Sequence, residues 1–293
     1  VAQAHDGSLG YAHSFIDAAA DSGVDAIKFQ THIAKAESTR DETFRVPLSG
    51  QDATRYEYWQ RMEFTAEGWA ALFNHAKARN ITFLSSAFSC DAVDLLEKLG
   101  MAAYKIGSGE VWSTDLLKSI AKTRKPILLS TGMSSFAEID NMVESIMGQG
   151  SELGIFQCTS EYPVALERVG LNICDEFRNR YNCPVGLSDH SGTVFPALAA
   201  MARGADMIEV HVTYDRRMYG PDTKASVTFA ELEMLTRARD AFHTMITHPV
   251  DKDAMVSDMA QMRKLFTKSV ALKTDMPKGT VLTEGILCAK RPG

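Results

Sequence analysis

Short apolar runs alternate along the chain with longer segments in which apolar residues recur every three or four positions. The short runs have the length of buried strands, whereas the longer segments have the period of amphipathic helices. Glycine, proline, aspartate or serine residues separate most of these runs. The pattern predicts eight strands, at residues 1–4, 26–31, 82–87, 103–106, 127–130, 153–157, 185–188 and 207–211.

A predicted helix follows each predicted strand. Gly23, Gly100 and Gly204 come directly after helices, where a left-handed residue commonly ends the helix. Eight strand–helix units in about 243 residues match the usual size of a closed (β/α)8 barrel, the TIM barrel. The helices are predicted at residues 8–20, 66–79, 91–99, 114–121, 136–147, 172–181, 194–203 and 229–243.

A doubly wound open sheet is the alternative architecture. Its dinucleotide-binding version requires a Gly-x-Gly-x-x-Gly motif after the first strand, and the chain has none there. Gly107 and Gly109 follow the fourth predicted strand without the third glycine of the motif. We therefore favour a single barrel domain over residues 1–243.

The sequence changes in character after this domain. Residues 244–262 have the composition of a linker or an irregular helix, and residues 263–293 that of the start of a small β-rich domain. Its strands are predicted at residues 269–273, 281–283 and 286–290. Because so few strands cannot close a core, we expect the chain to continue beyond Gly293. Since the first residue is Val1 and not Met, we also expect a trimmed N-terminus.

Composition narrows the class of protein. A net charge of -6 without a long basic run argues against nucleic acid or an anionic membrane as the main partner. No apolar run approaches the roughly 20 residues that span a bilayer. The five cysteines are scattered and never form a Cys-x-x-Cys motif, so they indicate neither a disulfide framework nor a zinc site. A reducing cytoplasm fits best.

The carboxyl ends of the predicted strands are rich in polar and ionisable residues. In a (β/α)8 barrel these ends form the active face. Serine and threonine residues after strands also cap helices, as we expect for Ser134 and Ser135. The strand-end residues with candidate roles are Lys28, Gln30, Ser86, Phe88, Lys105, Ser108, Glu110, Ser130, Ser160, Tyr162, Ser188, His190 and His211.

Lys28 and Lys105 lie within apolar strands. Burial of an unpaired ammonium group is costly, so each lysine requires an anionic partner. Glu110 is one candidate partner, and the phosphate or carboxylate of a bound ligand is the other. The residue pattern leaves both alternatives open.

His190 and His211 each end an apolar run. They can be strand-end histidines satisfied by hydrogen bonds, or the two ligands of a catalytic metal with coordination positions open to substrate. The polar strand ends around them favour the metal. Asp189 and Glu209 are then candidates to orient the imidazole rings. Asp222 follows a Gly-Pro turn and is either a turn residue or a ligand contact.

The ordered motifs of the chain resemble those of the sialic acid synthase family, which condenses phosphoenolpyruvate with N-acetylmannosamine or related amino sugars. The resemblance covers essentially the whole chain. It rests on His-Asp-Gly at 5–7, Lys-Phe-Gln-Thr at 28–31, Tyr-Lys-Ile-Gly-Ser-Gly-Glu at 104–110, Leu-Ser-Thr-Gly-Met at 129–133, Cys-Thr-Ser-Glu-Tyr-Pro at 158–163, Gly-Leu-Ser-Asp-His at 186–190, Ile-Glu-Val-His at 208–211, Gly-Pro-Asp at 220–222 and Lys-Arg-Pro-Gly at 290–293.

This resemblance implies a barrel followed by an antifreeze-protein-like (SAF) domain, a domain-swapped homodimer, and a divalent metal, Mn²⁺ before Mg²⁺ or Co²⁺, on His190 and His211. It also implies a glutamate upstream of Val1. The implied catalytic residues are Glu110, His190, His211 and Lys105. Those implied to bind phosphoenolpyruvate are Lys28, Ser86, Lys105, Ser108, Ser130, Ser160 and Ser188. Those implied to bind the sugar are Gln30, Phe88, Tyr162, Asp222 and, from a partner subunit, Arg291.

Two other functions remain open at this point. A different metal-dependent barrel aldolase or lyase would use the same histidines with pyruvate and release no phosphate. A sugar-binding protein without catalytic activity would bind the ligand without turnover. The two lysines and Glu110 argue against the sugar-binding protein without catalytic activity.

Overall fold

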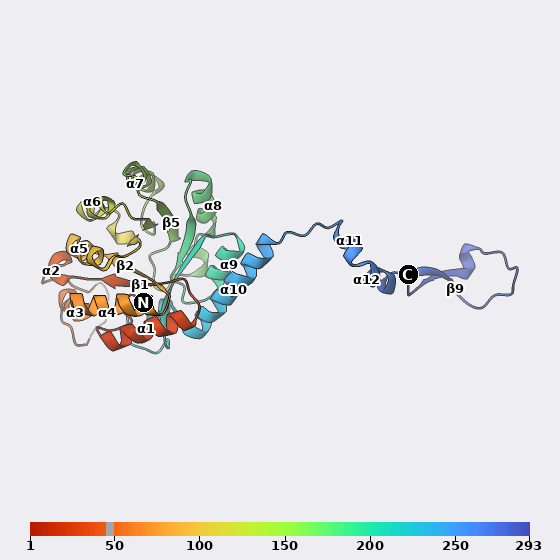
Figure 1. Cartoon of the computed structure of the whole chain (residues 1–293), viewed down its shortest axis with the longest axis horizontal. Coiled ribbons are helices and arrows are strands. Elements are labelled where there is room, and N and C mark those ends of the chain that lie inside the picture. The colour runs from red at the N-terminus through yellow and green to blue at the C-terminus, as the bar shows by residue number, and fades with distance from the viewer. Residues whose placement is uncertain (45–49) are drawn as a thin grey trace. The chain divides into compact units, whose positions relative to one another are not determined.

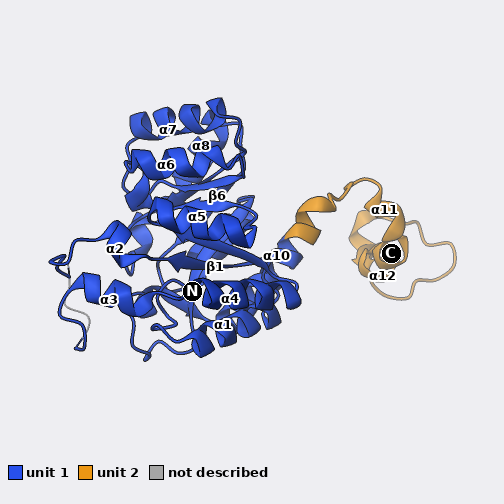
Figure 2. Ribbon diagram, turned by 60° about the vertical axis from the view of Figure 1, so that its left-hand side comes forward, with its two compact units in different colours: residues 1–242 blue, residues 243–293 orange. Residues whose placement is uncertain are grey.

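The computed structural model describes residues 1–44 and 50–293, which form two compact units, residues 1–242 and 243–293 (Figure 2). The first unit contains an eight-stranded parallel sheet whose strands follow one another in chain order (Figure 1). The strands are β1 (Ala26–Thr31), β2 (Thr82–Ala87), β3 (Tyr104–Ile106), β4 (Ile127–Ser130), β5 (Leu153–Cys158), β6 (Val185–Asp189), β7 (Met207–Thr213) and β8 (Ser226–Thr228).

Helices follow most of these strands and pack against the outer side of the curved sheet, as α4 does on β2 and α9 on β6 and β7 (Figure 1). The helices of the first unit are α1 (Leu9–Asp21), α2 (Ala34–Glu37), α3 (Arg55–Met62), α4 (Ala66–Ala78), α5 (Cys90–Leu99), α6 (Thr114–Lys122), α7 (Phe136–Gly148), α8 (Leu171–Arg180), α9 (Phe195–Ala202) and α10 (Phe229–Thr247), the last of which extends into the second unit.

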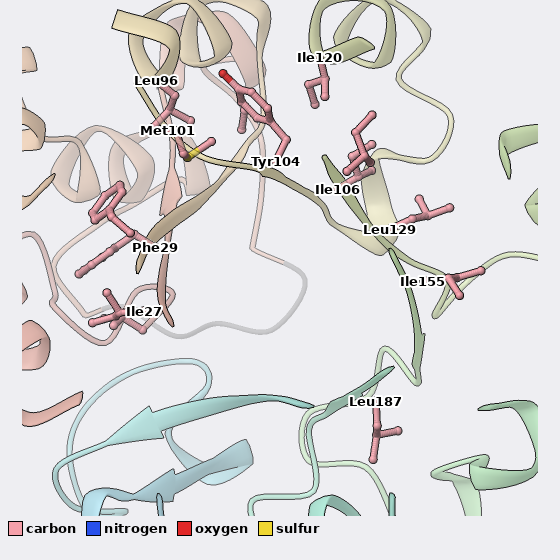
Figure 3. Close-up of a cluster of buried hydrophobic side chains, with 14 of the residues drawn as sticks. Ile27, Phe29, Leu96, Met101, Tyr104, Ile106, Ile120, Leu129, Ile155 and Leu187 are labelled. Atoms are coloured by element: carbon pink, nitrogen blue, oxygen red, sulfur yellow. The ribbon is translucent and has the colours of Figure 1, made fainter. Parts of the chain in front are cut away.

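The main core lies between the sheet and the helices (Figure 3). Alternate strand residues supply it, among them Phe29 on β1, Tyr104 on β3 and Leu187 on β6. Because side chains alternate along a strand, the residues between them project to the other, concave side of the sheet. Lys28 and Lys105 are two of these intervening residues. The strand period therefore sends the apolar residues to the helices and the charged ones to the concave face.

The predicted first strand is wrong. Residues 1–7 form turns, with positive φ angles at Ala2, Asp6 and Gly7, although the Val1 nitrogen donates to the Lys28 carbonyl at 2.8 Å. Alanine and glutamine have low strand propensity, and a turn follows directly, so this run is too short to form a strand.

The eighth strand, β8, was not predicted, because three residues are too few to show a strand period. It pairs with the end of β7, where His211 lies opposite Ser226. Among the described residues no strand pair joins β1 to β7 or β8, so the sheet curves without closing. The barrel prediction is confirmed only at the coarser level of a curved, eight-stranded parallel sheet with helices outside. Helix boundaries agree with prediction within a few residues.

Aromatic residues gather in the long segment between β1 and β2. Tyr58 and Trp59 of α3 form a small core with Ala34 and Met62, with Tyr56 packed against it, while Phe64 packs against the main core. The helix α3 begins with a capping box between Thr54 and Glu57. This cluster covers the carboxyl end of β1.

The second unit contains the short helices α11 (Met255–Asp258) and α12 (Ala260–Phe266) and an antiparallel hairpin of β9 (Ser269–Leu272) and β10 (Leu287–Lys290). The strand predicted at residues 281–283 is absent, since this segment belongs to an exposed loop. No helix in the described part of the chain is long and apolar enough to cross a membrane.

Candidate active site

A buried ionic cluster occupies the concave face of the sheet. The Lys105 ammonium donates to the Ser130 hydroxyl at 2.6 Å and to the Glu209 carboxylate at 3.1 Å. Glu209 also accepts from Ser188 at 3.0 Å and lies 3.7 Å from the Lys28 nitrogen. Only 2% of the Lys105 side chain is exposed. Strands β1, β3, β4, β6 and β7 thus contribute to one polar cluster.

Glu209 is the carboxylate that neutralises the two lysines. Burial alone would raise the pKa of Glu209, but Lys105 and Lys28 together outweigh it and hold the pKa well below its usual range. Burial lowers the pKa of Lys28, and Glu209 opposes that effect. Glu110, the partner suggested by the sequence, lies elsewhere, with its carboxylate accepting from Ser113 at 2.8 Å. One carboxylate thus serves two lysines.

His190 and His211 lie beside each other, with ring centroids 5.2 Å apart. Tyr162 contacts both rings, at centroid distances of 4.1 Å from His190 and 5.8 Å from His211. The Nδ1 atom of His190 donates to the Thr159 carbonyl at 2.9 Å. The Nδ1 atom of His211 lies 3.6 Å from the Asp222 carboxylate. In each ring, Nδ1 therefore faces an oxygen, and Nε2 is the nitrogen left to bind a further group.

Burial keeps both imidazoles neutral near pH 7. It lowers the pKa of His190, and burial together with His190 lowers the pKa of His211 well below its usual value. Burial also raises the pKa of Asp222 to about 6. A neutral imidazole whose Nδ1 is oriented by an oxygen acceptor offers the Nε2 lone pair to a metal. The pair therefore fits a metal site with two protein ligands.

The described residues contain no group of three or more His, Cys, Asp and Glu side chains arranged to hold a metal. The expectation that Asp189 and Glu209 orient the imidazoles is wrong. Asp189 accepts from the backbone and hydroxyl of Ser191, at 3.1 and 2.7 Å, while Glu209 serves the lysines. Thr159 and Asp222 lie next to the imidazole nitrogens instead. Asp189 is the direct neighbour of His190, and direct neighbours along a strand face opposite sides. Glu209 shares the side of His211 but is engaged by Lys28 and Lys105.

Gly132 lies at the centre of a ring of hydroxyl and thiol groups. A Cβ atom there would lie 2.5 Å from the Ser160 hydroxyl, 2.9 Å from that of Ser108 and 3.0 Å from the Cys158 sulfur. The Gly132 amide also donates to Ser108 at 3.0 Å. A residue without a side chain thus leaves room for these three groups close to the backbone, and we call this place the recess at Gly132.

A second group of residues surrounds the carboxyl end of β1. Gln30 contacts Gln3 and His32, while Phe88 stacks on His32 with ring centroids 4.3 Å apart. Burial raises the pKa of Glu110, Ser113 opposes this, and Glu37 adds to it. Gln30 and Phe88 thus both contact His32, and Glu37 lies close enough to Glu110 to affect its pKa. These residues form one region at the carboxyl end of β1.

These residues and the two clusters above lie in the unit that matches a known family. The sequence model of the NeuB family matches residues 15–250 of the chain. The chain belongs to the NeuB family. This confirms the family that the motifs suggested.

Named relatives of this NeuB-family chain are synthases. The chain is 35% identical to the N,N'-diacetyllegionaminic acid synthase of Campylobacter jejuni, over 98% of this chain and 87% of that protein. It is 30% identical to the human N-acetylneuraminate-9-phosphate synthase, over 99% of this chain and 81% of that protein. A crystal structure of the N-acetylneuraminic acid synthetase of Leptospira borgpetersenii has a TM-score of 0.77 at 26% identity, covering 89% of this chain and 88% of that one.

The remaining predicted residues of the NeuB-family chain lie as follows. Ser86 is buried opposite Lys105 in the register of β2 and β3. Arg291 belongs to the second unit, where its guanidinium donates to the Phe266 carbonyl at 3.0 Å. A cavity of about 490 Å³ lies along β1 and β7, and Lys28, Glu209 and His211 are among its lining residues.

Sequence reasoning missed the roles of Glu209, His32, Glu37 and Gly132. A signal existed for Glu209, because it lies two residues before His211 and so shares its side of β7. It also lies opposite Ser188 in the β6–β7 register. None existed for Gly132, since its role depends on side chains from two other loops.

Proposed function

We propose that this NeuB-family chain is a nonulosonic acid synthase. It would condense phosphoenolpyruvate with N-acetylmannosamine or a related 2-acetamido sugar, giving a nine-carbon 2-keto acid and phosphate. The observation that carries the proposal is the meeting, on one concave face, of the Lys28–Lys105–Glu209 cluster and the neutral His190–His211 pair. The named relatives support this choice of reaction.

The proposed phosphoenolpyruvate site consists of cations and hydroxyl groups. Two lysines share one carboxylate, so an anionic ligand would complete the charge balance. The recess at Gly132 offers the hydroxyls of Ser108 and Ser160 to a phosphate oxygen, and the Gly132 N–H orients the first of them by donating to it. The residues proposed to bind phosphoenolpyruvate are Lys28, Ser86, Lys105, Ser108, Ser130, Ser160 and Ser188.

A divalent ion, with Mn²⁺ favoured over Mg²⁺ or Co²⁺, would be held by His190 and His211 and would supply Lewis-acid polarisation of the sugar aldehyde. Gln30, Phe88, Tyr162 and Asp222 would position the open-chain sugar.

In the proposed reaction, C3 of phosphoenolpyruvate forms a bond with the aldehyde carbon, and water adds to the cationic C2 that results. Glu110 accepts a proton from this water, a role suited to a carboxylate whose pKa is raised. The C2–O bond to phosphate then breaks, leaving the ketone oxygen derived from water. The two water protons finish on the new sugar hydroxyl and on phosphate, and Lys105 and Lys28 stabilise the departing anion.

We further propose that residues 1–243 are the catalytic barrel, 244–262 a linker and 263–293 the start of an antifreeze-like domain. In a domain-swapped homodimer, Arg291 would reach the sugar bound by the other subunit. The exposed guanidinium, held by one backbone carbonyl, supports the availability of Arg291.

Incubation of the protein with phosphoenolpyruvate, Mn²⁺ and a panel of 2-acetamido sugars tests the function. We expect phosphate release with at least one sugar, and ¹⁸O in the bridging position of phosphoenolpyruvate to appear in the phosphate, because the C–O bond breaks. Absence of phosphate with every sugar, or a product formed from pyruvate, would overturn the proposal.

A further inference from the structure

His32 is held more completely than any role in sheet packing requires. Its ring lies between Trp59 and Phe88, nearly parallel to both, with centroid distances of 3.9 and 4.3 Å. Its Nδ1 atom lies 2.6 Å from a carboxylate oxygen of Glu37. Both side chains are more than nine-tenths buried. The ring therefore has neither rotational freedom nor direct access to water.

The contacts of His32 define its tautomer. A carboxylate oxygen accepts, so Nδ1 carries the proton and donates to Glu37. The Nε2 atom then has a lone pair, and the Gln3 amide nitrogen lies 3.2 Å from it. Gln3 donates one N–H to this nitrogen and the other to the Gln30 carbonyl oxygen. In the neutral tautomer this assignment joins the four side chains in one series, in which His32 Nε2 also lies 3.4 Å from the Gln30 oxygen.

This series of hydrogen bonds determines which end of the Gln30 amide is available. The Gln30 oxygen accepts from Gln3, and the structure gives its amide nitrogen no protein partner among the described residues. Gln30 lies two residues after Lys28 on β1, on the same, concave side of the sheet. The free N–H₂ group can only donate.

We infer that Gln3, His32 and Glu37 form a positioning relay that holds the Gln30 carboxamide with its N–H₂ group toward the bound amino sugar. The sugar must then present a hydrogen-bond acceptor at this point, and we assign this acceptor to the acetamido carbonyl, which is a stronger acceptor than the sugar hydroxyls. The inference rests on the proposed function. Gln3, His32 and Glu37 touch no substrate themselves. Through Gln30 they help to decide which sugar is accepted.

The second carboxylate oxygen of Glu37 supports the inference that Glu37 is there to orient His32. It is buried and has no hydrogen-bond partner among the described side chains and backbone groups. Such an unsatisfied buried oxygen destabilises the folded chain. Packing alone gives no reason to keep a carboxylate there, whereas the fixed Nδ1–H of His32 requires a strong acceptor.

The relay is tested by His32→Phe and Gln3→Leu, with His75→Phe and Gln149→Leu as matched controls outside the site. His32→Phe keeps an aromatic ring between Trp59 and Phe88 but removes both nitrogens. Steady-state kinetics are measured with the accepted 2-acetamido sugar and with the same sugar carrying hydrogen in place of the acetamido group. Thermal melting of each variant checks folding.

We expect both variants to raise KM for the acetamido sugar about tenfold, as for one lost oriented hydrogen bond, while KM for phosphoenolpyruvate changes less than about twofold. With the sugar lacking the acetamido group, the variants and the wild type have the same KM. Glu37→Gln keeps an oxygen that accepts from Nδ1, so its KM rises less than that of His32→Phe.

An equal rise in KM with both sugars, or no rise with either, would overturn the relay while the wild type remains active. Absence of phosphate release by the wild type with every sugar would instead overturn the proposed function, and the relay with it. If His32→Phe melts far below the wild type, Gln3→Leu decides, because Gln3 contacts neither aromatic ring.

Discussion

The pair His190 and His211 and the single His32 all lie near the carboxyl ends of strands in one sheet. The Nε2 atom of the ring distinguishes the pair from His32. In His190, Nδ1 donates to a backbone carbonyl and Nε2 has no further protein partner among the described residues. In His32, Nδ1 donates to Glu37 and Nε2 accepts from Gln3. A histidine with one free lone pair can bind a metal, whereas one with both nitrogens engaged can only position its neighbours.

The first prediction separates the two groups most strongly. His190→Ala and His211→Ala each remove a proposed metal ligand, so we expect phosphate release to fall by at least about 100-fold, the upper range for losing an outer-shell partner of a metal. His32→Phe keeps most of its maximal rate, because it changes only sugar positioning. Comparable losses of rate in all three variants would contradict the distinction.

The second prediction concerns the lysine cluster next to the metal pair. Glu209→Gln leaves Lys28 and Lys105 without their carboxylate, so we expect a loss of unfolding free energy of about 2–3 kcal/mol, measured by urea denaturation. Asp140→Asn breaks the exposed ion pair with Arg180 and serves as the control, with a clearly smaller loss because solvent screens this pair. Equal losses in the two variants would show that burial of the cluster contributes nothing.

The third prediction tests the recess at Gly132. The Cβ of Gly132→Ala would meet Ser160 and Ser108, so we expect KM for phosphoenolpyruvate to rise about tenfold and KM for the sugar to stay within about twofold. Gly148→Ala, where a Cβ meets nothing within 4 Å, is the matched control. A rise confined to the sugar would place the phosphate elsewhere.

The smallest effect is expected in the pH profile. Burial raises the pKa of Glu110, and the charge of Glu37 raises it further. Glu37→Gln removes that charge, so the acid limb of kcat/KM moves to lower pH by less than about one unit. A shift to higher pH would mean that Glu37 does not act on Glu110 by like-charge repulsion.

The same comparison shows how far the sequence alone could reach. Seven of the eight predicted strands and eight of the ten described helices of the first unit, all but α2 and α3, were recognisable from hydrophobic period, and His190 and His211 from the apolar runs that they end. The hydrogen-bond partners were not recognisable. Glu209 reaches Lys105 across the sheet, and His32 is fixed by Trp59 and Gln3 from distant segments, so these contacts depend on curvature and loop packing.

The turn at residues 1–7 was the main local error. Four residues with one valine resemble a strand start, yet Gln3 is buried as a hydrogen-bond donor to His32 and Gln30. A polar side chain that satisfies buried partners can override a weak strand propensity. Period alone gives no indication of such a contact.

The most direct test of the account is the metal content of the wild type, His190→Ala, His211→Ala and His32→Phe after incubation with Mn²⁺ and removal of unbound ion. We predict about one ion per chain in the wild type and in His32→Phe, and none in His190→Ala and His211→Ala. Full metal retention in His190→Ala and His211→Ala, or its loss in His32→Phe alone, would contradict it.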